Sequence, residues 1–129
     1  IVVKLSLKKI RQNLRPNQVG ITMDFLKFLQ DNAPLNRDLV IVFQDKRNES
    51  ITTGKHIDSE IVVFTKSRIL IDIFRTLAHE WVHSLQDQDP RNTKKSVQDH
   101  EDHANSLAGY LVRKFFEENP EHEVESYKD

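Results

Sequence analysis

The order of apolar and polar residues in the first third of the chain predicts a helix and a strand, preceded by a segment that fits either. Apolar residues between positions 1 and 14 match both the two-residue period of a strand and the spacing of a helix, so both structures stay open there. Pro16-Asn17 marks a break, after which apolar residues recur at helical spacing from Ile21 to Leu29, and Asn32-Ala33-Pro34 stops that pattern. Leu39 to Phe43 is a continuous run of β-favouring residues and predicts a buried strand.

The middle of the chain predicts a hairpin of two antiparallel strands. Ser50 to Gly54 and Glu60 to Thr65 are the two strands, and Lys55 to Ser59 is the turn between them. The first strand is short and polar and ends in glycine, which is typical of a strand at the edge of a sheet. Such a strand can pair with an extended peptide, because its outer backbone groups have no partner within the sheet.

The segment from Ile69 to Leu85 predicts a buried helix. Its apolar side chains leave almost no stripe for water, which is typical of a helix enclosed by other elements. Ser67 is a candidate cap for its start, and Asp72 lies within it. Asp87-Gln88-Asp89-Pro90 ends the helix and begins a connection.

A last helix is predicted to begin between Lys95 and Gln98 and to run to about Glu118, where Asn119-Pro120 stops it. The polar residues 121–129 predict a frayed C-terminal tail. The sequence contains no repeat and no second domain, so residues 1–120 are expected to form one α+β domain. In this domain a twisted, mostly antiparallel-edged sheet packs on the buried helix and on the last helix.

Composition narrows the classes of protein that fit these elements. The 129 residues are 37% hydrophobic and 30% charged, as in a globular protein rather than a disordered one. The chain has no cysteine, so a bound metal would be held by histidine and carboxylate side chains. The formal net charge is -1, with 19 basic and 20 acidic residues, and we therefore expect no nucleic-acid partner. Neither a membrane-spanning run nor a secretion leader is present in the sequence, so we expect a cytoplasmic protein.

The buried helix carries the pattern His79-Glu80-Trp81-Val82-His83. On a helix, His79 and His83 lie one turn apart on the same face and can present two imidazole nitrogens to one metal ion. Glu80 lies about 100° further round the helix, where it can reach a metal-bound water without being a ligand. Polar side chains on a buried helix need partners, and a metal ion would supply them.

Helical geometry selects Glu101 as the third metal ligand. At about 100° per residue, Glu101 shares a face of the last helix with the apolar residues that must point to the core, whereas His100 and His103 fall off that face. A histidine third ligand stays open as the alternative. Asn105 lies one turn after Glu101 and can accept a hydrogen bond from the Nδ1-H of His79 or His83, which would fix the nitrogen that binds metal. The apolar residues that define the face are Ala104, Ala108, Val112 and Phe115.

These residues resemble a known family of enzymes. His79-Glu80-Trp81-Val82-His83, followed by Glu101 and the segment up to Ala108, resembles the gluzincins, which are thermolysin-like zinc metallopeptidases. The second segment looks like the Glu-x-x-Ala-Asn-x-x-Ala helix of small ImmA-type and phage-encoded zinc peptidase-like proteins. The resemblance covers roughly residues 51–116.

The resemblance implies a small zincin-like fold and a set of site residues. It implies zinc on His79, His83 and Glu101, with Glu80 as the catalytic base. It also implies a peptide or protein substrate that lies against the edge strand. The residues implied on that strand are Ile51, Thr52, Thr53 and Gly54.

These residues predict zinc-dependent hydrolysis of peptide bonds. In this reaction a zinc-activated water attacks the peptide bond, and Glu80 is the general base. Two alternatives stay open. One is a catalytically weak or inactive zinc-binding interaction module. The other is a DNA-associated protease with a histidine third ligand, which is motivated by His100, His103 and the basic residues between Lys4 and Arg15. No membrane partner is expected, and the sequence does not indicate an oligomeric state.

Overall fold

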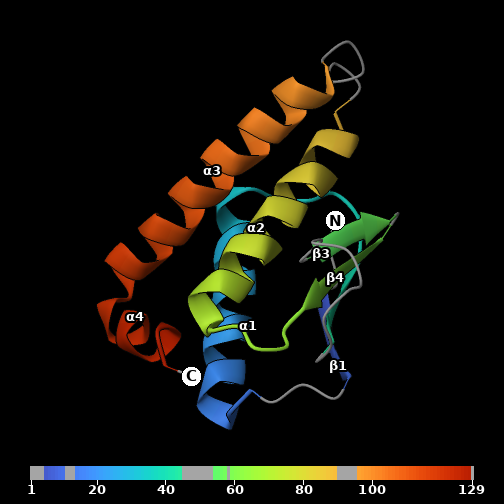
Figure 1. Ribbon diagram of the computed structural model, residues 1–129. Coiled ribbons are helices and arrows are strands. Elements are labelled where there is room, and N and C mark those ends of the chain that lie inside the picture. Colours follow the sequence, from blue (N-terminus) through green and yellow to red (C-terminus); the bar gives the residue numbers. More distant parts are fainter. Residues whose placement is uncertain (1–4, 11–13, 45–53, 58, 90–95, 129) are drawn as a thin grey trace.

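A computed structural model describes residues 5–10, 14–44, 54–57, 59–89 and 96–128. Four strands lie close together on one side of the molecule, and four helices lie on the other (Figure 1). In chain order the elements are β1 (Leu5–Ile10), α1 (Pro16–Asn32), β2 (Leu39–Gln44), β3 (Gly54–Ile57), β4 (Glu60–Phe64), α2 (Leu70–Asp87), α3 (Val97–Glu118) and α4 (Pro120–Ser126).

The strands form one sheet in the order β1-β2-β4-β3. The predicted α+β class is confirmed, but the expectation of a mostly antiparallel-edged sheet is wrong. β1, β2 and β4 run parallel, and only β3 is antiparallel to its neighbour. The reason lies in α1, which connects β1 to β2, because a helical crossover returns the chain to the same end of the sheet and makes the two strands parallel. The apolar residues before residue 14 fit either a strand or a helix. The sequence therefore predicted neither β1 nor the crossover that follows it.

The predicted hairpin is confirmed as an antiparallel pair, but its first strand extends further along the chain than predicted. Gly54 pairs with Val63 and Ile57 pairs with Glu60, so residues 55–57 belong to β3 and not to the turn. β3 is an edge strand, as predicted. Of the expected substrate-binding residues, Gly54 lies in β3, whereas Ile51, Thr52 and Thr53 are outside the described residues.

Two predicted helix starts need correction. Pro16 does not separate the segments but is the first residue of α1, a position that proline favours because its fixed φ suits a helix and its missing N–H is not needed there. Ser67 does not cap α2: it adopts a positive φ of 61°, and the N-cap residue is Ile69. The predicted start of α3 is confirmed, with the Ser96 hydroxyl accepting a hydrogen bond from the Asp99 N–H.

The predicted frayed tail is wrong over most of its length, since α4 follows directly after Asn119. Pro120 begins this helix, and acidic residues in its first turn complement the helix dipole. The Arg15 guanidinium lies 2.7 Å from a Glu125 carboxylate oxygen, and Ser126 is buried. These contacts attach α4 to the start of α1, so a polar sequence forms a docked helix here.

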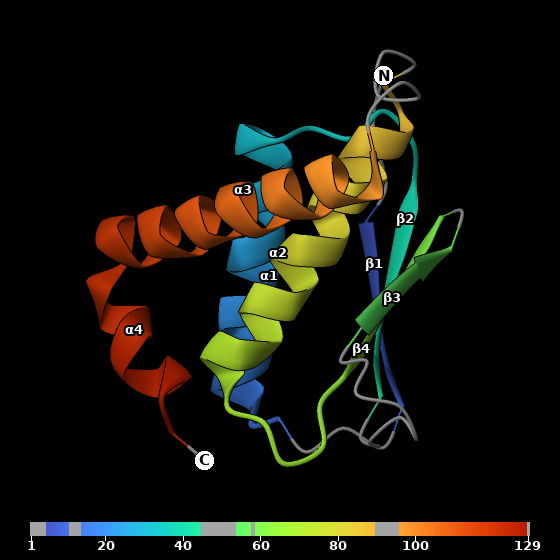
Figure 2. The same cartoon turned by 45° about the horizontal axis from the view of Figure 1, so that its top comes forward.

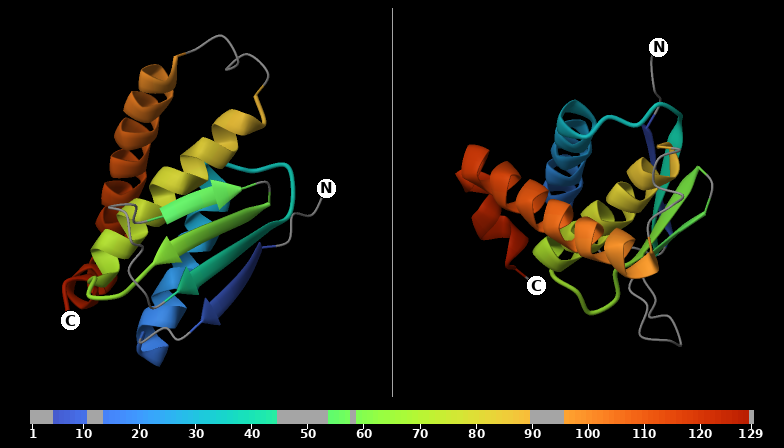
Figure 3. Two further views of the ribbon diagram at one scale, coloured as in Figure 1. Left: turned by 45° about the vertical axis from the view of Figure 1, so that its right-hand side comes forward. Right: turned by 90° about the horizontal axis from the view of Figure 1, so that it is seen from above.

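The core places α2 between the sheet and the other helices. Figures 2 and 3 show all four helices on one face of the sheet, with α3 on the side of α2 that is away from the strands. The rings of Phe25, Phe74 and Phe115 stack or meet edge to face, with centroids 4.3 Å apart for Phe25 and Phe74 and 5.0 Å apart for Phe25 and Phe115. Buried Ala104 and Ala108 keep α3 close to α2 because their side chains are small. Although α2 is mostly apolar, no helix in the described ranges is long and apolar enough to cross a membrane.

Trp81 offers a test of how α2 is held in the core. Its side chain is fully buried, and its indole N–H donates to the Ala33 carbonyl at 2.9 Å. Trp81→Phe should lower the free energy of unfolding by about 1–3 kcal/mol, because the carbonyl loses its donor and the smaller ring leaves a cavity. Chemical denaturation measures this change. Tyr110→Phe is the matched control, because it changes an exposed ring of α3, and its free energy of unfolding should change by no more than about 0.5 kcal/mol. Equal effects of the two variants would contradict the burial of Trp81.

Candidate metal centre

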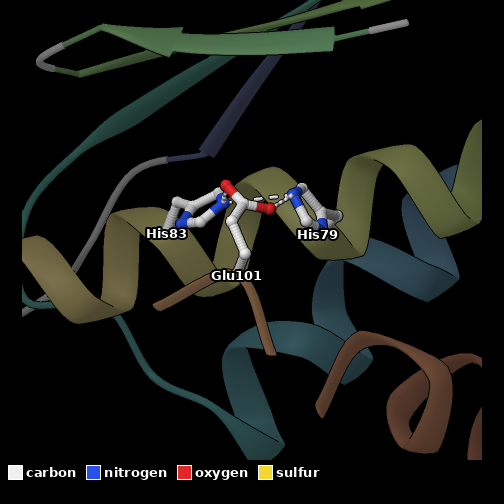
Figure 4. Close-up of side chains that lie close together, drawn as sticks. All are labelled: His79, His83 and Glu101. Carbon is white, nitrogen blue, oxygen red and sulfur yellow. Dashed lines mark hydrogen bonds and ion pairs between the residues drawn. The ribbon is translucent and has the colours of Figure 1, made fainter. Parts of the chain in front are cut away.

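Three side chains from two helices converge at one point. His79 and His83 lie one turn apart on α2, and their Nε2 atoms are 3.1 Å apart. Glu101 on α3 places Oε2 3.2 Å from Nε2 of His79 and Oε1 3.1 Å from Nε2 of His83 (Figure 4). The structure thus brings together all three predicted metal ligands. In the ranges that the structure describes, this is the one group of three or more histidine and acidic residues with ligand atoms close enough to share an ion.

The spacing and chemistry of these atoms fit zinc. Ligands at about 2.0–2.1 Å from a tetrahedral ion lie about 3.3 Å from one another, which is close to the separations between these three side chains. Two imidazole nitrogens and one carboxylate are a ligand set that zinc accepts, and three protein ligands are typical of catalytic sites. The Glu101 side chain is 44% exposed and that of His83 only 12%, so the centre opens to solvent on the α3 side.

Gln86 fixes the tautomer of His83. Its side-chain Nε2 donates to the His100 carbonyl at 2.9 Å, and a carbonyl can only accept, so the orientation of this amide is determined. Gln86 Oε1 therefore faces Nδ1 of His83 at 2.9 Å, and this nitrogen must carry the proton. In the neutral ring, Nε2 of His83 is then left with a lone pair directed at Glu101, as a metal ligand requires.

Asn105 is predicted to accept a hydrogen bond from His79 or from His83. Gln86 lies against Nδ1 of His83, which leaves His79 as the partner for Asn105. Asn105 is exposed and lines the groove beside His79, and its bond to that ring stays a prediction. Sequence reasoning missed Gln86, although a polar residue three positions after His83 on a largely apolar helix is the signal that identifies it.

The alternative histidine ligands lie elsewhere. His103 is exposed, and its Nδ1 accepts a hydrogen bond from Gln86 at 3.0 Å, while the His100 backbone carbonyl accepts another. Neither residue belongs to the group of ligand atoms around His79. The geometry therefore favours Glu101 as the third ligand.

A groove of about 550 Å³ runs beside the centre, and Glu80 lines it together with His79. Residues of α2 line it together with Gly54 of β3 and with Asn105, Ala108 and Gly109 of α3. The Glu80 side chain is largely buried, at 8% exposure for the residue. The predicted base and one predicted ligand thus face the same space.

Gly54 lets the edge strand approach Glu80. A Cβ atom at this position would lie 2.5 Å from Thr76 Cγ2, 3.2 Å from the Val62 carbonyl oxygen and 3.3 Å from Glu80 Cγ. Only glycine fits without a shift of these neighbours, so the backbone of β3 lies directly against the residues that line the groove.

Arg68 lies along the same groove, just before α2. Its guanidinium donates to the Phe64 carbonyl at 3.0 Å, the Asp72 carbonyl at 2.7 Å and the Thr76 hydroxyl at 2.6 Å. Burial lowers the pKa of Arg68 from its ordinary value, and the nearby charge of Asp72 partly offsets this effect. Arg68 therefore supplies a fixed and partly buried positive charge to the groove.

Comparisons of the chain with family models, with curated proteins and with solved structures found no match. The likeness to gluzincins accordingly remains one of motif residues, and the function proposed below depends on the geometry of His79, Glu80, His83 and Glu101.

Gln86 should control metal affinity. Gln86→Leu removes the acceptor that holds the proton on Nδ1 of His83, so zinc affinity should fall by about 10–100-fold. Competition with a fluorescent chelator measures the affinity, and circular dichroism checks that the variant is folded. Asn105→Leu is the comparison variant: it removes the amide that is predicted to bond His79 and leaves the Gln86–His83 bond in place, so the loss should be smaller. A larger loss for Asn105→Leu than for Gln86→Leu would show that Asn105 orients the ligands.

Gly54→Ala should destabilise the fold by about 1–3 kcal/mol, because the added methyl group overlaps Thr76 and crowds Glu80. Gly109→Ala is the control: its Cβ would meet no atom within 4 Å, and alanine should stabilise α3 by about 0.5–1 kcal/mol. Urea denaturation of both variants measures the two changes. A neutral Gly54→Ala variant would mean that β3 does not lie this close to α2.

Proposed function

We propose that this chain is a zinc-dependent metallopeptidase with a zincin-like site. The observation that carries the proposal is the convergence of His79, His83 and Glu101 beside a groove that Glu80 also lines. The arrangement provides metal ligands, a base and room for a substrate in one place. Each of these parts is needed for metal-assisted hydrolysis of a peptide bond.

Zinc bound to the three ligands would act as a Lewis acid that lowers the pKa of a water molecule and polarises a carbonyl group. Glu80 is the residue that we assign as general base. It precedes His83 by three residues on the same helix, and its carboxylate can take a proton from the attacking water and pass it to the leaving amine. Its burial against Gly54 and Thr76 keeps the carboxylate in place beside the groove.

The substrate is proposed to bind as an extended peptide along β3. This strand pairs with β4 on one side, and among the strands that the structure describes its other side is the edge of the sheet. An extended peptide can hydrogen-bond to such an edge, and the absence of a side chain at Gly54 brings the edge next to Glu80. Backbone pairing would give affinity for many peptides and would leave selectivity to side chains elsewhere in the groove.

A purely structural zinc site is the alternative that the geometry favours less. Structural zinc sites are closed by four protein ligands, whereas the group found in the described ranges has three, with its carboxylate partly exposed beside a groove. DNA-associated proteolysis is also less favoured. The ligand that it assumed, His100 or His103, does not join the group, and the net charge is -1.

Glu80→Gln tests the assigned base. Hydrolysis should fall by about 10²–10⁴-fold, because the amide cannot accept a proton, while zinc affinity should stay the same because Glu80 is not a ligand. Cleavage of a mixture of unstructured peptides, followed by mass spectrometry, measures the activity, and metal analysis measures the zinc.

The controls separate the base from the metal. Glu60→Gln changes an exposed carboxylate on β4 and should leave cleavage unchanged. A chelator should abolish cleavage by the parent chain, and added zinc should restore it. Full activity in the Glu80→Gln variant would show that another residue is the base, and activity that survives complete metal removal would contradict the proposed function.

A further inference from the structure

The Arg68 guanidinium donates its hydrogen bonds to neutral oxygens, and the charge of Asp72 lies near it. Its three acceptors are two backbone carbonyls and the Thr76 hydroxyl, and none carries a formal charge. The carboxylate of Asp72 is directed at a different cation, Arg75, at 3.3 Å. Within the described ranges, no ion pair joins Arg68 to a carboxylate. The charge of Asp72 offsets only part of the effect of burial on Arg68, so a further anion that reached the guanidinium would stabilise it.

The position of Arg68 places this charge close to the reaction. The guanidinium is bonded to Thr76, which precedes Glu80 by one helical turn, or about 6 Å along α2. An extended peptide advances about 3.3 Å per residue. A group that binds Arg68 would therefore belong to a residue about two positions from the peptide bond that lies beside Glu80.

We propose that Arg68 selects substrates that carry a carboxylate about two residues from the cleaved bond. This inference rests on the proposed peptidase function and names the substrate class of the same site. The carboxylate can come from an acidic side chain or from the C-terminus of the peptide, since both offer a carboxylate oxygen to the N–H groups on Nε and Nη1 of the guanidinium, whose Nη2 already donates to Asp72 and Thr76. A singly charged group fits better than a phosphate dianion, because the carboxylates of Asp72 and Glu80 line the same groove.

Arg68 is a better candidate than Arg75, which also lines the groove. The Arg75 side chain is 59% exposed and is paired with Asp72. An exposed and paired charge adds little to affinity, whereas the three hydrogen bonds of Arg68 hold its planar group in one orientation before a ligand arrives. Arg75 therefore serves as the matched control for a general effect of positive charge.

The test uses the full chain with Glu80→Gln and bound zinc, so that peptides bind without being cleaved. The probes are labelled peptides in matched pairs, with Asp or Glu against Asn or Gln at each position, and with a free C-terminal carboxylate against a C-terminal amide. Fluorescence anisotropy measures the affinity. We expect one acidic position, or the free C-terminus, to improve affinity by about tenfold or more, which corresponds to a charged hydrogen-bonded pair.

Two further variants assign the preference to a residue. Adding Arg68→Gln should remove the tenfold preference and leave zinc affinity unchanged, whereas adding Arg75→Gln should keep most of it. A preference for acidic side chains identifies an internal acidic residue as the ligand, and a preference for the free acid identifies the C-terminus. Equal affinity for the two peptides of every pair would overturn the inference. The inference would also be overturned if Arg75→Gln reduced the preference as much as Arg68→Gln does.

The experiment also distinguishes this inference from the proposed function. If the chain binds carboxylate peptides through Arg68 but cleaves no peptide, the inference stands and the proposed peptidase function is wrong. If the parent chain cleaves peptides without any preference for a carboxylate, the proposed function stands and the inference is wrong.

Discussion

The burial of α2 is the constraint on which the rest of the structure depends. The sheet covers one side of this helix, and α1 and α3 cover others, so that most of its residues have no access to water. Its few polar side chains must then find partners within the protein or bind a ligand. His79, Glu80, His83 and Gln86 all lie in the second half of the helix, and this is where α3 brings Glu101 close. The burial of α2 therefore explains why these polar groups lie together and form the candidate metal centre.

The approach of α3 completes the site, and small local features bring it about. Ser96 caps the start of the helix, and Ala104 and Ala108 allow close contact with α2. Gln86 connects the two helices, since one amide contacts His83 on its own helix and the His100 carbonyl on α3. Loss of this amide would disturb the protonation of one ligand and the position of the helix that carries another. We therefore expect metal binding at the proposed centre to depend on the packing of the two helices.

Much of the site could be predicted from the sequence because helical periodicity is regular. The spacing of His79 and His83, and the angular position of Glu101 relative to buried alanines, need only the geometry of one helix at a time. The direction of the strands could not be predicted in the same way, because it depends on β1, whose apolar residues fit two periods. The docking of α4 involves contacts with α1, α2 and α3, among them the ion pair between Arg15 and Glu125, which are far apart in the sequence. Gln86 was missed because its importance depends on contacts with two different helices.

The central claim is that two imidazoles and one carboxylate hold a single zinc ion. X-ray absorption spectroscopy at the zinc edge, on protein with a measured metal content, tests it most directly. The account predicts one zinc per chain, two imidazole rings in its coordination shell, and nitrogen and oxygen ligands at about 2.0–2.1 Å. Replacement of Glu101 by Gln should change the oxygen ligands and leave the two imidazole signals in place. A chain that holds no stoichiometric zinc, or one whose zinc is bound by a single imidazole or by three, would contradict the account.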